Sequence, residues 1–170
     1  VEGVLGQGAF GITYKGTDTN LQKSVAIKEY CPRGYAGRDE NTGLLAPLSE
    51  GATDVFDWGL DRFIEEGRTL AKLRHPNIVN VHSVFEANGT AYLIMDLEEG
   101  QGLDTLVRAG DRPGEDQLLG WLHGILDALE CVHEAGFLHR DIKPENVLLR
   151  PDGSPVVLDF GSARPEQSGR

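Results

Sequence analysis

The chain has 170 residues and a formal net charge of −11 at pH 7, with 39% apolar and 25% charged residues. Nucleic-acid binding needs a basic surface that displaces counterions, so this acidity argues against a nucleic-acid partner. The composition is that of a soluble globular protein large enough for one or two compact units. No apolar run approaches the roughly 18 residues of a membrane-spanning helix, so we expect no membrane contact within this segment.

The two cysteines, Cys31 and Cys131, belong to no CxxC pair and no Cys/His cluster. This pattern predicts reduced thiols of an intracellular protein without structural zinc, and it favours a cytoplasmic location. The sequence starts at Val1 with neither an initiating Met nor a signal peptide, which indicates a segment of a longer protein. A membrane anchor outside the segment is compatible with both observations.

The first part of the chain predicts an antiparallel sheet. β-Branched and aromatic residues bounded by turn residues indicate five strands, at residues 1–6, 12–17, 24–29, 81–86 and 91–96. The last two are joined through Asn88 and Gly89, a pair that supplies the positive φ angles of a tight hairpin turn.

One helix is expected between the third and fourth strands, at residues 58–73. Its apolar residues follow helical spacing, although Gly67 lies inside it and should cost about 1 kcal/mol relative to Ala. Residues 30–57 before it are rich in Gly, Pro, Asn and Asp and predict a long loop. This loop could carry a short strand pair or a regulatory insert.

The second part of the chain predicts helix and short strands. Residues 115–134 form a strongly amphipathic pattern, and Gly136 is placed to end that helix in the left-handed conformation. Two short strands are expected at 147–149 and 156–158. A strand-rich part therefore precedes a helical part, with a hinge near 96–100, and the fold class is α+β with two lobes.

The first chemical motif is the spacing GxGxxG at Gly6, Gly8 and Gly11. A dinucleotide-binding fold uses the same spacing, but there the glycines open a helix. Here strand-forming residues 12–14 follow, so the glycines join two strands and let backbone N–H groups approach phosphates without an intruding Cβ. A plain glycine-rich turn is the alternative interpretation of this motif alone.

The second motif is Lys28, which directly follows the apolar residues 25–27. A lysine on a half-buried strand is unfavourable unless its ammonium group is paired. A phosphate together with a carboxylate from the helix would satisfy it. The alternative is a surface lysine whose head reaches solvent.

The most specific motif is HRDIKPEN at residues 139–146, followed by DFG at 159–161. With the glycines and Lys28 in the same order, the chain resembles eukaryotic-type serine/threonine protein kinases, in particular bacterial members. The resemblance implies a protein-kinase-like two-lobed fold. Residues 1–96 would form an N-lobe with an antiparallel sheet, one main helix and an insertion at 30–57, and residues 97–170 an incomplete helical C-lobe.

The resemblance assigns the catalytic roles. Asp141 would orient the substrate hydroxyl and accept its proton, and Lys143 would contact the transferring phosphate. Asn146 and Asp159 would hold Mg²⁺ ions that bridge the ATP phosphates. Lys28 would bind the α- and β-phosphates.

The carboxylate that pairs with Lys28 would be Glu66, with the adjacent Glu65 as the alternative. A solvated face carrying both glutamates is the third possibility. Thr13 stands where the family usually has valine over the adenine. The residues that the resemblance places around the nucleotide are Leu5, Gly6, Gly8, Gly11, Thr13, Ala26, Lys28, Met95, Asp96, Glu98, Asn146, Leu148 and Asp159.

Two departures from the family pattern matter. Lys28 and Glu66 are 38 positions apart, about twice the usual family spacing, and only nine residues follow Gly161. We therefore expect a truncated piece of a longer kinase that uses ATP and Mg²⁺ to phosphorylate serine or threonine in proteins, the piece alone having little activity. A pseudokinase or nucleotide-binding regulatory module is the alternative, disfavoured because Lys28, Asp141, Asn146 and Asp159 are all present. A small-molecule kinase is disfavoured by the stretch 143–146.

Overall fold

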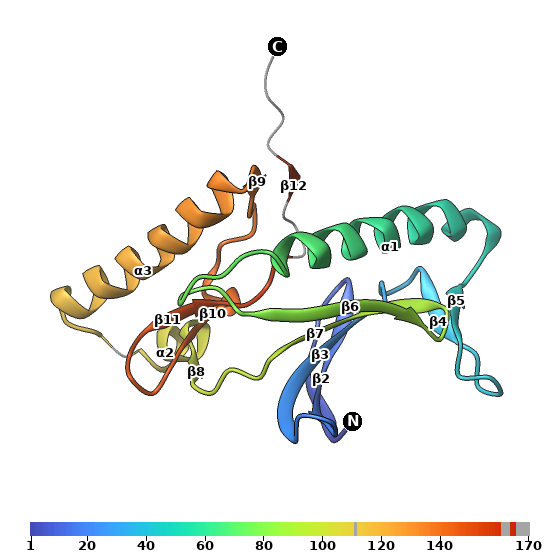
Figure 1. The fold of residues 1–170 in the computed structure, drawn as a ribbon, viewed down its shortest axis with the longest axis horizontal. Coiled ribbons are helices and arrows are strands. Elements are labelled where there is room, and N and C mark those ends of the chain that lie inside the picture. Colours follow the sequence, from blue (N-terminus) through green and yellow to red (C-terminus); the bar gives the residue numbers. More distant parts are fainter. Residues whose placement is uncertain (111, 161–163, 166–170) are drawn as a thin grey trace, which may run out of the picture. The chain divides into compact units, whose positions relative to one another are not determined.

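The computed structural model describes residues 1–110 and 112–160, and the backbone of 164–165. The chain divides into two compact units, which are described separately. The first comprises Val1–Lys72 and Val81–Leu97, and the second Leu73–Asn80 and Glu98–Arg170. The first is mainly strands with one long helix, and the second is mainly helices with short strands, as Figure 1 shows. The expected α+β class is confirmed.

The first unit is built on a five-stranded antiparallel sheet with the strand order β1-β2-β3-β7-β6. The five predicted strands are all present, with ends shifted by no more than two residues: Gly3–Gln7 (β1), Gly11–Asp18 (β2), Lys23–Tyr30 (β3), Val81–Ala87 (β6) and Thr90–Asp96 (β7). The β6–β7 turn has the expected positive φ angles, 52° at Asn88 and 73° at Gly89.

The strand register assigns side chains to the two faces of the sheet. Directly paired residues of antiparallel strands point to the same face. Thr13 pairs with Lys28 and Lys28 with Leu93, so these three share one face, called here the α1 face. Neighbouring positions such as Glu29 and Tyr92, which also pair, lie on the opposite face.

Helix α1 (Glu50–Leu70) is longer than expected at its start. The prediction of 58–73 is wrong by eight residues there and by three at the end. Ala52 and Phe56 are buried and extend the apolar stripe by two turns. The rings of Phe56 and Phe63 pack on Tyr30 with centroid distances of 5.4 and 5.7 Å, which anchors both halves of the helix to the sheet.

Two glycines let α1 lie close to the sheet. A Cβ atom at Gly67 would come within 2.2 Å of Leu93 Cδ2, and one at Gly59 within 2.1 Å of the Tyr30 hydroxyl oxygen. Glycine in a helix is unfavourable in itself, but any side chain at these two positions would push the helix outwards. The glycine that weakened the helix prediction is therefore explained by packing.

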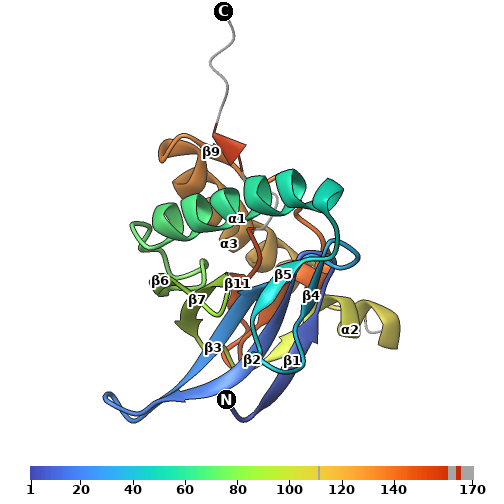
Figure 2. The ribbon, with the colours of Figure 1, turned by 90° about the vertical axis from the view of Figure 1, so that its right-hand side faces the viewer.

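The expected loop at 30–57 contains regular structure, so the prediction of a plain loop is wrong. It carries the antiparallel hairpin of β4 (Ala36–Arg38) and β5 (Leu45–Pro47), followed by the first turns of α1 (Figure 2). The alternative of a short strand pair is confirmed. The sequence pattern did not reveal this hairpin, because its strands are only three residues long and the glycine and asparagine residues around them indicate a loop.

The second unit contains α2 (Leu103–Ala109) and α3 (Glu115–Glu134). The bounds of α3 and the left-handed φ of 80° at Gly136 are as expected, whereas α2 was not predicted. Strands β8 (Gln101–Gly102), β10 (Val147–Leu149) and β11 (Pro155–Val157) form a sheet in the order β11-β10-β8, and β9 (Phe137–Leu138) pairs with β12 (Arg164–Pro165). A short 3₁₀ helix, η1 (Pro144–Asn146), precedes β10.

One side of α3 packs through Trp121, Ala128 and Val132, which are buried. The other side exposes a row of leucines, each about half accessible: Leu118, Leu119, Leu122 and Leu126. These four side chains form an exposed apolar patch on the surface of α3. No helix in the described part of the chain has both the length and the apolar character needed to cross a membrane.

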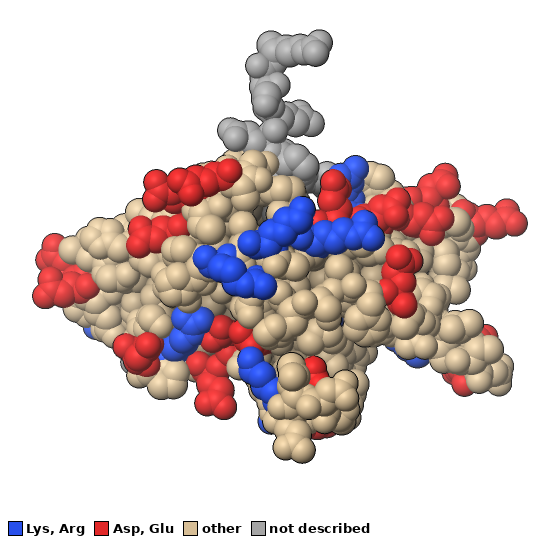
Figure 3. Space-filling view, in the orientation of Figure 1, with Lys and Arg blue, Asp and Glu red and all other residues tan. Residues whose placement is uncertain are grey.

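Acidic residues dominate the first turns of α1, whereas its later turns carry charges of both signs. The N-terminal half carries Glu50, Asp54, Asp57 and Asp61, and acidic side chains dominate that end of the helix in Figure 3. Arg68 lies in the last turn. Glu50 in the first turn and Arg68 in the last turn complement the helix dipole, which favours negative charge at the N-terminus and positive charge at the C-terminus.

Candidate active site

In the first unit, the glycine-rich loop (residues 6–11) joins β1 to β2, and the Gly8 N–H donates to the Gly11 carbonyl at 2.9 Å. A strand follows the glycines rather than a helix, as expected. A Cβ at Gly11 would lie 2.3 Å from the Glu29 carbonyl oxygen, so packing against β3 requires this glycine. A Cβ at Gly6 or Gly8 would meet no protein atom within 4 Å. These two positions leave room for a ligand to approach the backbone.

Lys28 points towards α1. Its Nζ lies 6.0 Å from the centroid of the Phe63 ring, one helical turn before Glu66. Glu65 is exposed and forms an ion pair with Arg62 at 2.5 Å on the outer side of the helix. Glu66 is partly buried. This arrangement supports Glu66, rather than Glu65, as the carboxylate on the side of Lys28.

The residues expected around the adenine share one face of the sheet. Thr13 and Lys28 pair directly, and Ala26, two positions before Lys28, pairs with Met95, so their side chains lie together on the α1 face. Ala26 and Met95 are buried. Leu5 lies at an irregularity of β1 between Val4 and Gly6 and is half exposed.

Asp96 ends β7 and pairs with Val25. Its carboxylate accepts hydrogen bonds from Lys23 at 2.5 Å and contacts His82 Nε2 at 2.8 Å. The side chain is therefore engaged on the sheet surface.

In the second unit, the catalytic loop is held by His139. This side chain is buried, packs against the Phe160 ring in a tilted arrangement with a centroid distance of 4.5 Å, and accepts a hydrogen bond from the Asp141 N–H at Nδ1 over 3.3 Å. Between them, Arg140 has a left-handed φ of 63°. A non-glycine residue in that region is strained, and such strain is concentrated at functional sites. The bend at Arg140 thus places Asp141 directly after the buried side chain of His139, which holds this part of the loop.

Two neighbours hold the carboxylate of Asp141. Lys143 Nζ lies 2.8 Å from Oδ2, and Asn146 Nδ2 donates to Oδ2 at 3.0 Å and to the Asp141 main-chain carbonyl at 2.8 Å. The hydrogen bond from Lys143 lowers the pKa of Asp141, with a further contribution from Asn146. The same contact raises the pKa of Lys143. The site therefore holds a stably ionised carboxylate beside a stably charged ammonium group.

Asn146 and Asp159 are brought together by the β10–β11 hairpin. The Leu158 N–H donates to the Asn146 carbonyl at 3.0 Å, and Asp159 follows directly. Because Asn146 uses its amide nitrogen towards Asp141, its amide oxygen is the atom suited to a cation. Leu148, in β10, pairs with Val156 and with Gly102 of β8.

Two hard oxygen ligands fit Mg²⁺, which takes one or two protein ligands and completes its shell with phosphate and water. Across residues 1–110 and 112–160, no three His, Cys, Asp or Glu side chains gather into a metal-binding cluster. An all-protein metal cage is therefore not a feature of the described chain. Gly161, the last residue of the third motif, lies outside the described residues.

Arg150 is a structural residue that the motifs did not indicate. Its guanidinium donates to both carboxylate oxygens of Glu98, at 2.7 and 2.8 Å, and to the Pro76 carbonyl at 2.7 Å. This pair fixes the side chain of Glu98. No local pattern links residues that lie 52 positions apart, so the pair could not be found from the sequence.

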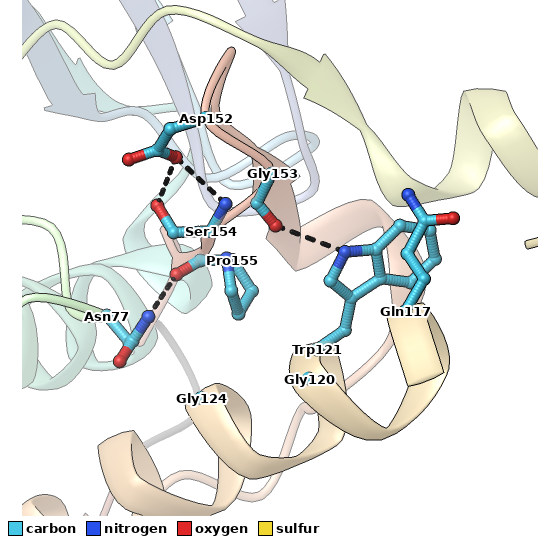
Figure 4. A pocket seen from close by; sticks show the side chains of 9 residues that line it. All are labelled: Asn77, Gln117, Gly120, Trp121, Gly124, Asp152, Gly153, Ser154 and Pro155. Carbon is cyan, nitrogen blue, oxygen red and sulfur yellow. Dashed lines mark hydrogen bonds between the residues drawn. The ribbon is translucent and has the colours of Figure 1, made fainter. Parts of the chain in front are cut away.

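A shallow cavity of about 530 Å³ lies between α3 and the β10–β11 turn (Figure 4). It is lined by residues such as Gln117, Trp121 and Asp152, and the Trp121 Nε1–H donates to the Gly153 carbonyl at 3.1 Å. None of its nine lining residues is among the predicted site residues. The candidate active site is therefore defined by the motifs and their contacts, not by this cavity.

The chain matches the protein kinase domain family over residues 1–170. It belongs to that family, and the resemblance inferred from the motifs is confirmed.

Its relatives include bacterial kinases. It is 34% identical over 165 residues to the probable serine/threonine-protein kinase SCO3848 of Streptomyces coelicolor, and 32% identical over 166 residues to the serine/threonine-protein kinase PknA of Mycobacterium tuberculosis. In both cases 95% of this chain is covered, against 22% and 34% of the relatives, respectively. A solved structure described as the apo form of PpkA-294 aligns with a TM-score of 0.85 and 35% identity, covering 94% of this chain and 57% of its own. The chain thus spans only part of the length of these relatives.

Proposed function

We propose that the protein containing this chain transfers the γ-phosphoryl group of ATP to serine or threonine hydroxyls of protein substrates. The observation that carries the proposal is the catalytic loop, in which Lys143 and Asn146 both hold the carboxylate of Asp141. Membership of the protein kinase family and the serine/threonine kinases among its relatives support the same activity.

Asp141 orients the attacking hydroxyl. Because its pKa is lowered, the carboxylate is ionised at neutral pH and accepts a hydrogen bond from the substrate hydroxyl. As the bond from the hydroxyl oxygen to the γ-phosphorus forms, the bond to the β,γ-bridging oxygen breaks, ADP leaves, and the hydroxyl proton passes to this carboxylate. Lys143, 2.8 Å from the same carboxylate, places a positive charge where the transferring phosphoryl group carries negative charge.

The first unit binds the nucleotide. Gly6 and Gly8 let the phosphates approach the loop backbone, and Lys28 neutralises the α- and β-phosphates while Glu66 orients its ammonium group. Thr13, Ala26 and Met95 face the adenine from the sheet. Asn146 and Asp159 are the residues that would hold Mg²⁺, which would supply positive charge to neutralise the phosphates.

A cytoplasmic location is part of this proposal. ATP is available there, and the two cysteines, Cys31 and Cys131, are free thiols of the kind that a reducing compartment maintains.

The test is transfer of labelled γ-phosphate from Mg·ATP to a generic protein substrate by the native-length protein and its Asp141→Asn variant. Asp152→Asn is the matched control, since it changes an exposed aspartate in the β10–β11 turn. We expect transfer to serine and threonine that persists in the control and falls by at least about a hundredfold in Asp141→Asn. Binding of ATP without any transfer by the unsubstituted protein would contradict the proposal and indicate a nucleotide-binding regulator.

A further inference from the structure

The segment between β3 and the start of α1, residues 31–49, contacts three other parts of the first unit. We call it the brace. It contains the β4–β5 hairpin and the two connections that flank it. Its contacts suggest a specific role in the nucleotide site.

The first contact of the brace is with the tip of the glycine-rich loop. The Cys31 N–H donates to the Phe10 carbonyl at 3.0 Å, and the Arg33 N–H donates to the Ala9 carbonyl at 2.9 Å. These bonds continue the β2–β3 ladder, which pairs Gly11 with Tyr30, past the end of the strands. The loop tip is therefore hydrogen-bonded to the brace instead of projecting alone into solvent.

The second contact is an ion pair with a buried carboxylate. The side chain of Glu29 is 2% accessible, and Arg38 in β4 donates to its Oε1 at 2.5 Å. Tyr92 donates to the same oxygen at 2.6 Å and Tyr14 to Oε2 at 2.9 Å. Arg38 also donates to the Gly43 carbonyl at 2.6 Å, which fixes the turn of the hairpin. Arg38 thus ties the brace to Glu29 of β3, whose carboxylate also accepts from Tyr14 of β2 and Tyr92 of β7.

The third contact is with the β6–β7 turn. The Leu45 N–H donates to the Asn88 carbonyl at 2.8 Å, and the Leu45 side chain is buried. A Cβ at Gly89 would lie 2.3 Å from the Leu45 carbonyl oxygen, so the two backbones are in close contact. The paired residues Arg38 and Leu45 therefore hold the turn end of the hairpin, while Cys31 and Arg33 hold the connection before β4.

We propose that the brace holds the tip of the glycine-rich loop in place for the phosphates of ATP, and that Arg38 is the positioning residue that anchors it. A loop that is ordered before the ligand arrives loses less conformational entropy on binding, which strengthens affinity. The inference rests on the proposed nucleotide site, because that site assigns the loop to the phosphates. Arg38 itself touches no expected ligand position and acts through the brace.

The test compares Arg38→Met with Arg62→Met in the native-length protein. Arg62 also pairs with a glutamate at 2.5 Å, but that pair is exposed on α1, so it controls for the loss of one arginine ion pair. Three measurements are made on each variant. They are the dissociation constant for Mg·ATP, the change in KM for ATP compared with the change in kcat, and the rate of amide hydrogen exchange at Cys31 and Arg33 without nucleotide. Arg38→Lys and the double variant Glu29→Gln/Arg38→Met complete the series.

We expect Arg38→Met to raise the dissociation constant and KM for ATP roughly five- to tenfold, with a smaller change in kcat. Exchange at Cys31 and Arg33 should accelerate by a similar factor, Arg38→Lys should restore part of both effects, and Arg62→Met should change neither. The double variant should bind ATP no more weakly than the worse of the two single variants, because both substitutions break the same ion pair.

Lower thermal stability of Arg38→Met with unchanged ATP affinity and unchanged exchange at these two amides would overturn the proposal. If the unsubstituted protein binds no ATP, the proposed function fails. The exchange measurement still decides on the brace in that case, because it needs no nucleotide.

Discussion

The side-chain amide of Asn146 donates to both the main-chain carbonyl and the carboxylate of Asp141, at 2.8 and 3.0 Å. One side chain therefore fixes both the carboxylate proposed to act in catalysis and the path of the loop that carries it. Asn146 is buried, so these hydrogen bonds are shielded from solvent.

Replacing Asn146 with alanine should lower kcat more than it raises the dissociation constant for ATP alone. The substitution removes both hydrogen bonds to Asp141 and the amide oxygen proposed for Mg²⁺. We expect a loss of at least about a hundredfold in kcat, measured by phosphate transfer in the native-length protein. Thermal unfolding of the same variant separates this effect from misfolding. A variant that folds normally and retains kcat would contradict the assigned role.

A pair of glycine substitutions tests the packing of α1. Gly67→Ala should destabilise the protein by about 1–3 kcal/mol, because its methyl group would meet buried Leu93 at 2.2 Å and Val84 Cβ at 3.2 Å. Gly120→Ala in α3 should instead stabilise by about 0.5–1 kcal/mol, since a Cβ there meets no atom within 4 Å and alanine favours helix. Denaturant unfolding of both variants measures the difference. Equal effects of the two substitutions would show that α1 does not lie as close to the sheet as described.

The buried carboxylate of Glu29 should make stability depend on pH in the acid range. Burial alone would raise its pKa, but hydrogen bonds from Tyr92, Arg38 and Tyr14 outweigh burial and lower it from 4.5. A lowered folded pKa contributes stability that is present above the unfolded pKa and is lost as pH falls through the folded value. Glu29→Gln should therefore be destabilised by about 1–3 kcal/mol at neutral pH. The difference from the unsubstituted protein should narrow below about pH 4.5.

Unfolding in denaturant at a series of pH values measures this dependence. Glu65→Gln is the control, because Glu65 pairs with Arg62 on the exposed side of α1. A gap between Glu29→Gln and the unsubstituted protein that stays constant into the acid range would count against an ionised Glu29.

Tyr30 should produce the opposite dependence at alkaline pH. Burial raises its pKa to about 12 from 10.0. When the pKa of a group is raised in the folded state, its contribution to stability is complete below the pKa of the unfolded state. That contribution is lost as pH rises through the pKa of the folded state. The free energy of unfolding should fall by up to about 1.4 kcal/mol per pH unit above pH 10 on this account. Tyr30→Phe should show a shallower alkaline slope, with exposed Tyr35→Phe as the control, measured by unfolding at each pH. An unchanged slope in Tyr30→Phe would refute the assignment.

The parts of the fold that could be predicted are those with strong local signals. The bounds of α3 follow from its apolar periodicity and from Gly136, and the β6–β7 hairpin follows from Asn88 and Gly89. The motif residues of each unit were found because their spacing is specific. Asp141, Lys143 and Asn146, expected in one site, are indeed in contact.

The parts that could not be predicted depend on contacts between distant positions. The first turns of α1 were missed because Phe56 is recognisable as a core residue only once Tyr30 is known to face it. The Arg38–Glu29 pair has no signature in a segment dominated by turn residues. An indirect signal did exist, since a glutamate at a buried strand position requires a partner.

The Arg150 contacts have a consequence for folding during synthesis. Pro76 and Asn77 belong to the second unit, yet they leave the ribosome before the last two strands of the first-unit sheet. Their partners come much later in the sequence. Arg150 is 74 positions after Pro76, and Pro155, whose carbonyl accepts a hydrogen bond from Asn77, is 78 positions after Asn77. Residues 73–80 therefore lack their final partners while the sheet of the first unit forms from the strands that precede and follow them in the sequence. The second unit can form only when residues beyond 150 have emerged, so the first unit folds first and the catalytic loop is set last.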